Sequence, residues 1–120
     1  MPLTWIKKIH NTEFVSSSEY TEQFRSFYRL FNSEIRKFLK SLGASKIEIN
    51  RGHFESYGFF TLNDKVWYFS LSDVRFYNPT YIFFIRKAKD YNDFTGGLNI
   101  FIKTSDEESF ISDFRKIVLG

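Results

Sequence analysis

The spacing of apolar residues changes at Gly43, from a helical period to a strand period. From Phe24 to Leu42 the apolar side chains follow one another at intervals of three and four residues, which places them on one side of a helix. Gly43 supplies the left-handed residue that often ends a helix. The Ser-Ser-Ser-Glu run at residues 16–19 fits a capping box, so we expect this long helix to begin near Ser17.

Beyond Gly43 the apolar residues alternate with polar ones or form short continuous runs, as they do in strands. Asn63-Asp64 is a tight hairpin signal, and Asn78-Pro79 interrupts the chain before a further strand. Because the connections are short, neighbouring strands are expected to be antiparallel. The expected strands are residues 46–50, 57–62, 65–71, 81–87 and 98–103, which form a meander of about five strands.

A second helix is expected to begin at residues 105–108, whose Ser-Asp-Glu-Glu order is again a capping box with Ser105 as the cap. Its apolar stripe consists of Phe110, Ile111, Phe114, Ile117 and Val118. Near the N-terminus, residues 3–10 fit either a strand or a single helical turn. The sequence therefore predicts one α+β domain, in which a long N-terminal helix and a short C-terminal helix flank a single antiparallel sheet.

The predicted strands are apolar on both faces, although two helices cover only one face of a sheet. We therefore expect an exposed aromatic face and place Trp67 and Phe69 among its binding residues. An uncovered apolar area of roughly a few hundred Å² usually marks a partner surface. Two alternatives remain: the N-terminal segment or residues 72–78 fold over this face, or it is the seam of a homodimer.

Four cations share one side of the long predicted helix, and we call them the basic ridge. They fall within a stripe of roughly 60°, because each residue turns the helix by about 100°. The ridge consists of Arg25, Arg29, Arg36 and Lys40. It fits phosphate or acidic groups, but Glu22 shares the stripe, so an ordinary solvated helix face is the alternative. The net charge of +3 favours an acidic partner without identifying it.

The composition excludes several kinds of site. The 120 residues include no cysteine, so disulfides and thiolate metal sites are absent. No segment has the length of a secretory signal core or a membrane helix, and we expect a cytoplasmic protein without a membrane partner. The two histidines, His10 and His53, are far apart and have no carboxylate at ligand spacing. We expect neither a metal nor a cofactor.

No nucleophile elbow, phosphate-binding glycine loop or dinucleotide fingerprint occurs in the chain, and we expect a protein that is not an enzyme. One enzymatic alternative is a metal-free, toxin-like RNase that uses scattered basic and aromatic side chains. Its candidate residues are Arg51, His53, Arg75, Arg86 and Lys87.

Aromatic residues make up 21% of the chain, which exceeds what a small core requires. Residues 55–62 partly resemble the central RNP1 motif of RNA-recognition motif domains, with Tyr57-Gly58-Phe59 at its core. That resemblance implies stacking of unpaired bases on the sheet. A stand-alone module that binds single-stranded RNA or DNA is therefore another alternative.

The polar loop at residues 86–97 has the order basic, x, Ala-Lys, spacer, Asp, aromatic, Thr-Gly-Gly. This order resembles a loop of small proteins carried by phages and other mobile elements, and the chain is similar in kind to anti-CRISPR proteins. The resemblance implies a non-enzymatic inhibitor that binds a host CRISPR effector nuclease or its guide-RNA complex, with RNA as a further expected partner. The loop residues expected to contact the partner are Arg86, Lys87, Lys89 and Tyr91.

The alternative is that the loop is a braced hairpin connection. Lys87 or Lys89 would then pair with Asp90 or Asp93, and Thr95 would close the turn.

Overall fold

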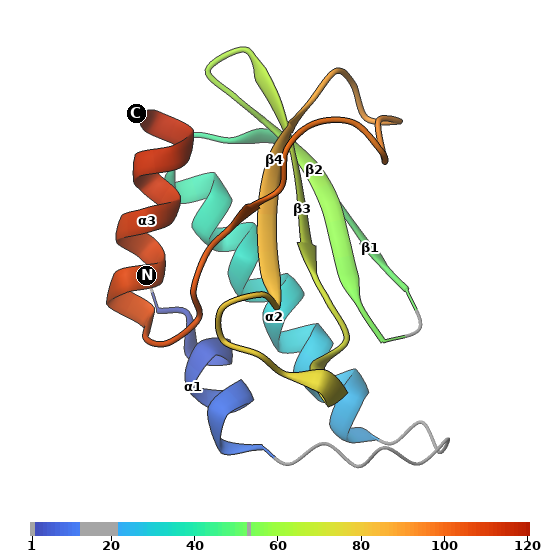
Figure 1. Cartoon of the computed structure of the whole chain (residues 1–120), viewed down its shortest axis with the longest axis vertical. Helices are drawn as coiled ribbons and strands as arrows, with labels where there is room; N and C mark the ends of the chain where they lie inside the picture. The colour runs from blue at the N-terminus through green and yellow to red at the C-terminus, as the bar shows by residue number, and fades with distance from the viewer. Residues whose placement is uncertain (1, 13–21, 53) are drawn as a thin grey trace.

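The computed structural model describes residues 2–12, 22–52 and 54–120 (Figure 1). Its elements are α1 (Thr4–Asn11), α2 (Glu22–Ser41), β1 (Ser45–Arg51), β2 (Ser56–Leu62), β3 (Lys65–Leu71), the 3₁₀ turn η1 (Val74–Phe76), β4 (Phe83–Ala88), β5 (Ile100–Phe101) and α3 (Glu107–Leu119). The sheet order is β1-β2-β3-β4-β5, and every neighbouring pair is antiparallel. The predicted α+β fold, with a long N-terminal and a short C-terminal helix around one five-stranded sheet, is confirmed.

The N-terminal segment, which the sequence left open between strand and turn, is the helix α1. The described residues therefore contain a third helix, where the sequence allowed either a strand or a single helical turn. Its side chains Trp5, Ile6 and Ile9 are buried, as is the preceding Leu3. The Trp5 ring packs edge-on against Phe31 of α2 at 4.9 Å and Phe110 of α3 at 5.4 Å. The indole thus joins all three helices.

The helices pack against one face of the sheet, which we call the inner face; we call the opposite side the outer face. Figure 1 shows α1 and α3 on the side of the sheet away from the loop that follows β4. At the centre of the inner face, the Phe83 ring lies 5.0 Å from Phe110, and the Phe60 ring stacks on Phe114 at 6.1 Å. These rings form the core.

The end of α2 and the start of α3 show how the helix boundaries arise. Gly43 has φ +95° and donates its N–H to the Lys40 carbonyl, which confirms the predicted helix end. At α3 the N-cap is Asp106, whose carboxylate accepts from the Ser109 N–H at 2.8 Å. The expected cap at Ser105 is therefore wrong by one residue. The capping box predicted at residues 16–19 lies outside the described residues.

The strand boundaries follow the turns. Asn63 and Asp64 both have positive φ, as a tight hairpin with the right-handed twist of its strands requires. β4 begins later than predicted, because the Ile82 N–H bonds to the Asn78 carbonyl and closes a turn. β5 is shorter than the predicted 98–103, with only two residues in strand conformation.

Gly58 permits the close approach of β1 to β2. A Cβ added there would lie 1.9 Å from the Glu48 carbonyl oxygen, so the backbone itself would have to move. We predict that Gly58→Ala lowers the free energy of unfolding by at least about 2 kcal/mol, measured by urea denaturation.

Gly43→Ala is the matched control, because its Cβ would make only an ordinary contact with Leu62 Cδ1 at 3.9 Å and the positive φ alone is unfavourable. It should cost about 1 kcal/mol. Equal losses in the two variants would contradict the role of the Glu48 contact.

Candidate binding surface

The loop between β4 and β5 covers part of the outer face. The Tyr91 hydroxyl lies 2.7 Å from Thr61 Oγ1, and its ring stacks on Phe59 at 5.3 Å. The Phe94 ring meets Phe59 edge-on at 5.2 Å. Phe59 is 1% exposed as a result. The face that the sequence left uncovered is thus partly covered by this loop, rather than by the N-terminal segment or residues 72–78.

Arg86 is the buried side chain that holds the loop in place, with 2% of its surface exposed. Its guanidinium donates to the backbone carbonyls of Asp93 at 2.6 Å and Lys87 at 3.3 Å. The Asp93 carboxylate is 3.8 Å away, and the Tyr68 ring lies 4.5 Å below the guanidinium carbon. Arg86 was expected to contact a partner. It is instead occupied inside the protein, because one planar group satisfies several loop acceptors at once.

The Asp93 carboxylate organises the remainder of the loop. It accepts the backbone N–H groups of Lys89 at 3.0 Å and Gly96 at 2.9 Å. These two hydrogen bonds, together with the charge of Arg86, hold the pKa of Asp93 below its ordinary value. Gly97 has φ +86°, and a Cβ there would lie 3.0 Å from the Lys87 carbonyl oxygen.

The arginine, aspartate and glycines of the loop motif therefore have structural tasks. The braced loop expected from the sequence does form, but its ion pair joins Arg86 to Asp93. The two lysines proposed for that pairing, Lys87 and Lys89, are exposed.

Beside the loop, six aromatic side chains remain partly or largely exposed, and we call them the aromatic surface. Tyr81, Phe94 and Phe101 are 61%, 51% and 43% exposed. The rings form a continuous series, with centroid distances between 5.3 and 6.4 Å. The members are Tyr57, Tyr68, Tyr81, Phe84, Phe94 and Phe101. This surface runs from the loop to the β5 edge of the sheet.

Trp67 and Phe69 do not belong to it, and the expectation that they are exposed is wrong. Both side chains point to the inner face, where they are 2% and 0% exposed. Side chains alternate along β3, so Tyr68 between them reaches the outer face instead. The sequence showed two apolar faces but did not show which of them the helices cover.

The basic ridge lies on α2. Arg25, Arg29 and Lys40 are exposed, and Arg25 pairs with Glu22 at 3.5 Å on the surface. Arg36 is half-buried and donates to the Ile47 carbonyl of β1 at 3.3 Å. Because α2 covers the inner face, the ridge and the aromatic surface are on opposite sides of the protein. The structure does not join them into one surface.

The three arginines considered for an RNase are held by neighbouring side chains. Arg75 forms an ion pair with Asp73 at 2.6 Å and lies 3.5 Å over the Phe54 ring. Arg51 lies over the Tyr28 ring, and Arg86 is bound to Asp93. Lys87 is exposed, with its ammonium 6.0 Å from the Trp67 ring centroid. His53 lies outside the described residues.

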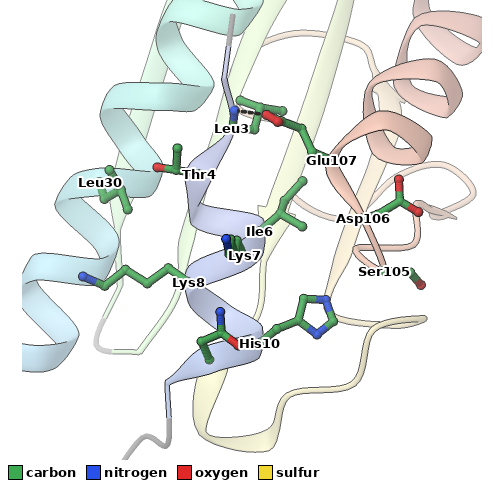
Figure 2. Close-up of a pocket in the computed structure, with 11 residues that line it drawn as sticks. Leu3, Thr4, Ile6, Lys7, Lys8, His10, Leu30, Ser105, Asp106 and Glu107 are labelled. Carbon is green, nitrogen blue, oxygen red and sulfur yellow. Dashed lines mark hydrogen bonds between the residues drawn. The ribbon is translucent and has the colours of Figure 1, made fainter.

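A hollow of about 730 Å³ lies beside α1, and sequence reasoning missed it (Figure 2). It forms where α1 meets the start of α3, and the Leu3 N–H donates to Glu107 across this contact at 2.6 Å. Its walls include both Lys7 and Asp106, so it carries mixed charge. Nearby, His10 Nε2 lies 2.7 Å from the Thr104 carbonyl oxygen and 2.9 Å from the Tyr77 hydroxyl.

Within the described ranges, no group of three histidine or acidic side chains is arranged to hold a metal ion. Of the helices in the same ranges, none has the length and apolar composition needed to cross a bilayer. No protein-family model, curated protein or solved structure matches this chain.

We predict that Arg86→Lys lowers the free energy of unfolding by about 2 kcal/mol, because an ammonium cannot reach all the acceptors that the guanidinium serves. Urea denaturation measures the loss. Lys87→Ala changes an exposed neighbour and should cost less than about 0.5 kcal/mol. If both variants have the stability of the original protein, Arg86 does not hold the loop.

The lowered pKa of Asp93 predicts a pH dependence. Since the folded pKa lies below the unfolded one, the carboxylate stabilises the protein above the ordinary aspartate pKa. That contribution is lost as the pH falls through the lowered folded value. In Asp93→Asn it is absent at neutral pH.

The difference in midpoint urea concentration between the original protein and Asp93→Asn should therefore shrink steadily below about pH 4. Asp73 and Asp106, whose pKa values are also lowered, are unchanged in both proteins and cancel in the comparison. A difference that stays constant with pH would contradict this role of Asp93.

Proposed function

We propose that this chain is a non-enzymatic binding protein that docks on a larger protein through its aromatic surface. We further propose that the partner is a host RNA-guided nuclease, as for the anti-CRISPR proteins that the sequence resembles. Binding would block access to the guide, the target or the nuclease site.

The observation that carries the proposal is the exposed series of rings beside a braced loop. Tyrosine and phenylalanine supply large contact areas and are frequent energetic centres of protein interfaces. Phe94, at the tip of the series, is held by a loop that Arg86 and Asp93 already fix. Little conformational entropy would then be lost on binding, which favours affinity.

The charges near these rings favour a protein over a free nucleic acid. Arg86 is neutralised by Asp93, and the negative charge of Glu55 adds to burial in raising the pKa of Tyr68. A phosphate backbone would meet little positive charge at this part of the surface. In the proposed complex, the exposed Lys89 contacts acidic groups at the rim of the aromatic surface.

The basic ridge on α2 supports a second, separate contact. Arg25, Arg29 and Lys40 face solvent on the side away from the aromatic surface. Guide RNA or an acidic patch of a large effector assembly would satisfy them while the rings bind protein.

A stand-alone module for single-stranded RNA or DNA is the second candidate. The row of partly exposed rings across β2, β3 and β4 favours it, because bases stack on such platforms. Its affinity for free strands should fall steeply as the salt concentration rises.

The test compares Phe94→Ala with Phe76→Ala. Phe76 is an equally apolar residue that is 74% exposed in η1, outside the aromatic surface. We expect the original protein to inhibit DNA cleavage by at least one effector in a panel of reconstituted RNA-guided nucleases. Phe94→Ala should weaken this inhibition at least about tenfold, and Phe76→Ala should leave it unchanged.

The second part of the test uses labelled single-stranded RNA and DNA. Binding to free RNA or DNA in a gel-shift assay, without inhibition of any effector, would replace the proposal by the second candidate. Equal activity of the two phenylalanine variants would remove the aromatic surface from the mechanism.

A further inference from the structure

The edge of the sheet at β1 is protected against pairing with another strand. Its register is irregular between Ser45 and Glu48, and Lys46 in this interval has φ +50°. Arg36 already donates to the Ile47 carbonyl at the same place. Irregular backbone and charged side chains are the usual means of blocking strand addition at an edge.

At the opposite edge the two paired residues of β5 keep a regular register. We call residues 97–103 the β5 edge segment. This segment includes the two residues of β5 and runs alongside β4. Gly97 lies against the Lys87 carbonyl, Ile100 is in register with Ile85, and the Ile102 N–H donates to the Phe83 carbonyl at 3.1 Å. Apolar side chains dominate this segment.

Two of these side chains are largely exposed, Leu98 at 84% and Phe101 at 43%. The only charged residue from Gly97 to Lys103 is Lys103. An apolar and almost uncharged edge has few side chains that oppose strand addition.

The hydrogen-bond pattern shows which backbone groups are available there. Because Phe83 and Ile102 form a hydrogen-bonded pair, the alternation of an antiparallel ladder leaves Phe84 and Phe101 as a non-hydrogen-bonded pair. The N–H and C=O of Phe101 therefore point away from β4. By the same alternation, the backbone groups of Asn99 and Lys103 also face the edge.

We propose that a second copy of this chain pairs antiparallel with the β5 edge segment, about a two-fold axis at Phe101. The two Phe101 residues would exchange N–H to C=O hydrogen bonds, and their rings would lie side by side on the outer face. This register places Asn99 opposite Lys103 of the second copy, so an amide oxygen meets an ammonium group.

The charges suit this self-pairing. No two like charges stand opposite each other in this register, and each copy carries a net charge of only +3. Strand addition extends the sheet sideways and leaves its faces open. The aromatic surfaces of the two copies then become continuous across Phe101. The inference does not depend on the proposed nuclease partner.

Sedimentation velocity at a series of concentrations tests the pairing. We expect the original protein to approach twice its monomer mass of 14.4 kDa as the concentration rises. Phe101→Glu and Phe101→Lys each place like charges at the two-fold axis, and each should raise the dimer dissociation constant at least about tenfold. An equal mixture of these two variants should recover dimers, because opposite charges then face each other.

Phe94→Glu is the matched control. It changes an exposed phenylalanine of the same aromatic surface away from the β5 edge segment, and it should leave the dimer intact. The inference is overturned if the original protein stays monomeric at every concentration. It is also overturned if both Phe101 variants still dimerise as the original protein does, or if their mixture does not recover dimers.

Hydrogen exchange on the original protein gives an answer that does not depend on how well the variants fold. The amide of Phe101 should exchange more slowly as the protein concentration rises. The amide of Ile100, which faces β4, should show no such dependence. Exchange at Phe101 that is independent of concentration would also overturn the inference.

Discussion

The buried guanidinium of Arg86 is the interaction on which the outer side of the protein depends. It lies between the Tyr68 ring and the backbone of the loop after β4, and it bonds to the Asp93 carbonyl. The Asp93 carboxylate in turn gathers two backbone N–H groups. A charge inside a protein is costly unless it is paired and hydrogen-bonded, so the loop and the arginine require each other.

This local arrangement divides the aromatic residues into two groups. The rings of the inner face, with Trp5 and the helical phenylalanines, form the core and are fully buried. On the outer face the loop covers Phe59 but leaves Tyr81, Phe94 and Phe101 accessible. The accessible rings are thus held by a rigid support, which is what a protein-binding surface needs in order to limit the entropy lost on association.

The positions of charge and apolar surface suggest how the parts would work together. The basic ridge faces away from the sheet, while the rings occupy the other side and reach the β5 edge. A large assembly that offers both a protein surface and an exposed polyanion could engage both sides at once. The contrast between the β1 edge and the β5 edge is the basis of the proposed pairing of two copies.

The sequence by itself determined the fold class and most of the elements, because local rules decide them. The three-and-four spacing before Gly43, the Asn63-Asp64 turn and the period of two in the strands each act over a few residues. The same reasoning placed a brace in the loop after β4, although it chose the lysines in place of Arg86.

Only the tertiary structure decided which apolar face the helices cover, and therefore that Trp67 and Phe69 are buried while Tyr68 reaches the outer side. It also separated the basic ridge from the aromatic surface. Strands that are apolar on both faces carry no local signal for this choice. The choice depends on how three helices and one loop, distant in the chain, bury the most surface together.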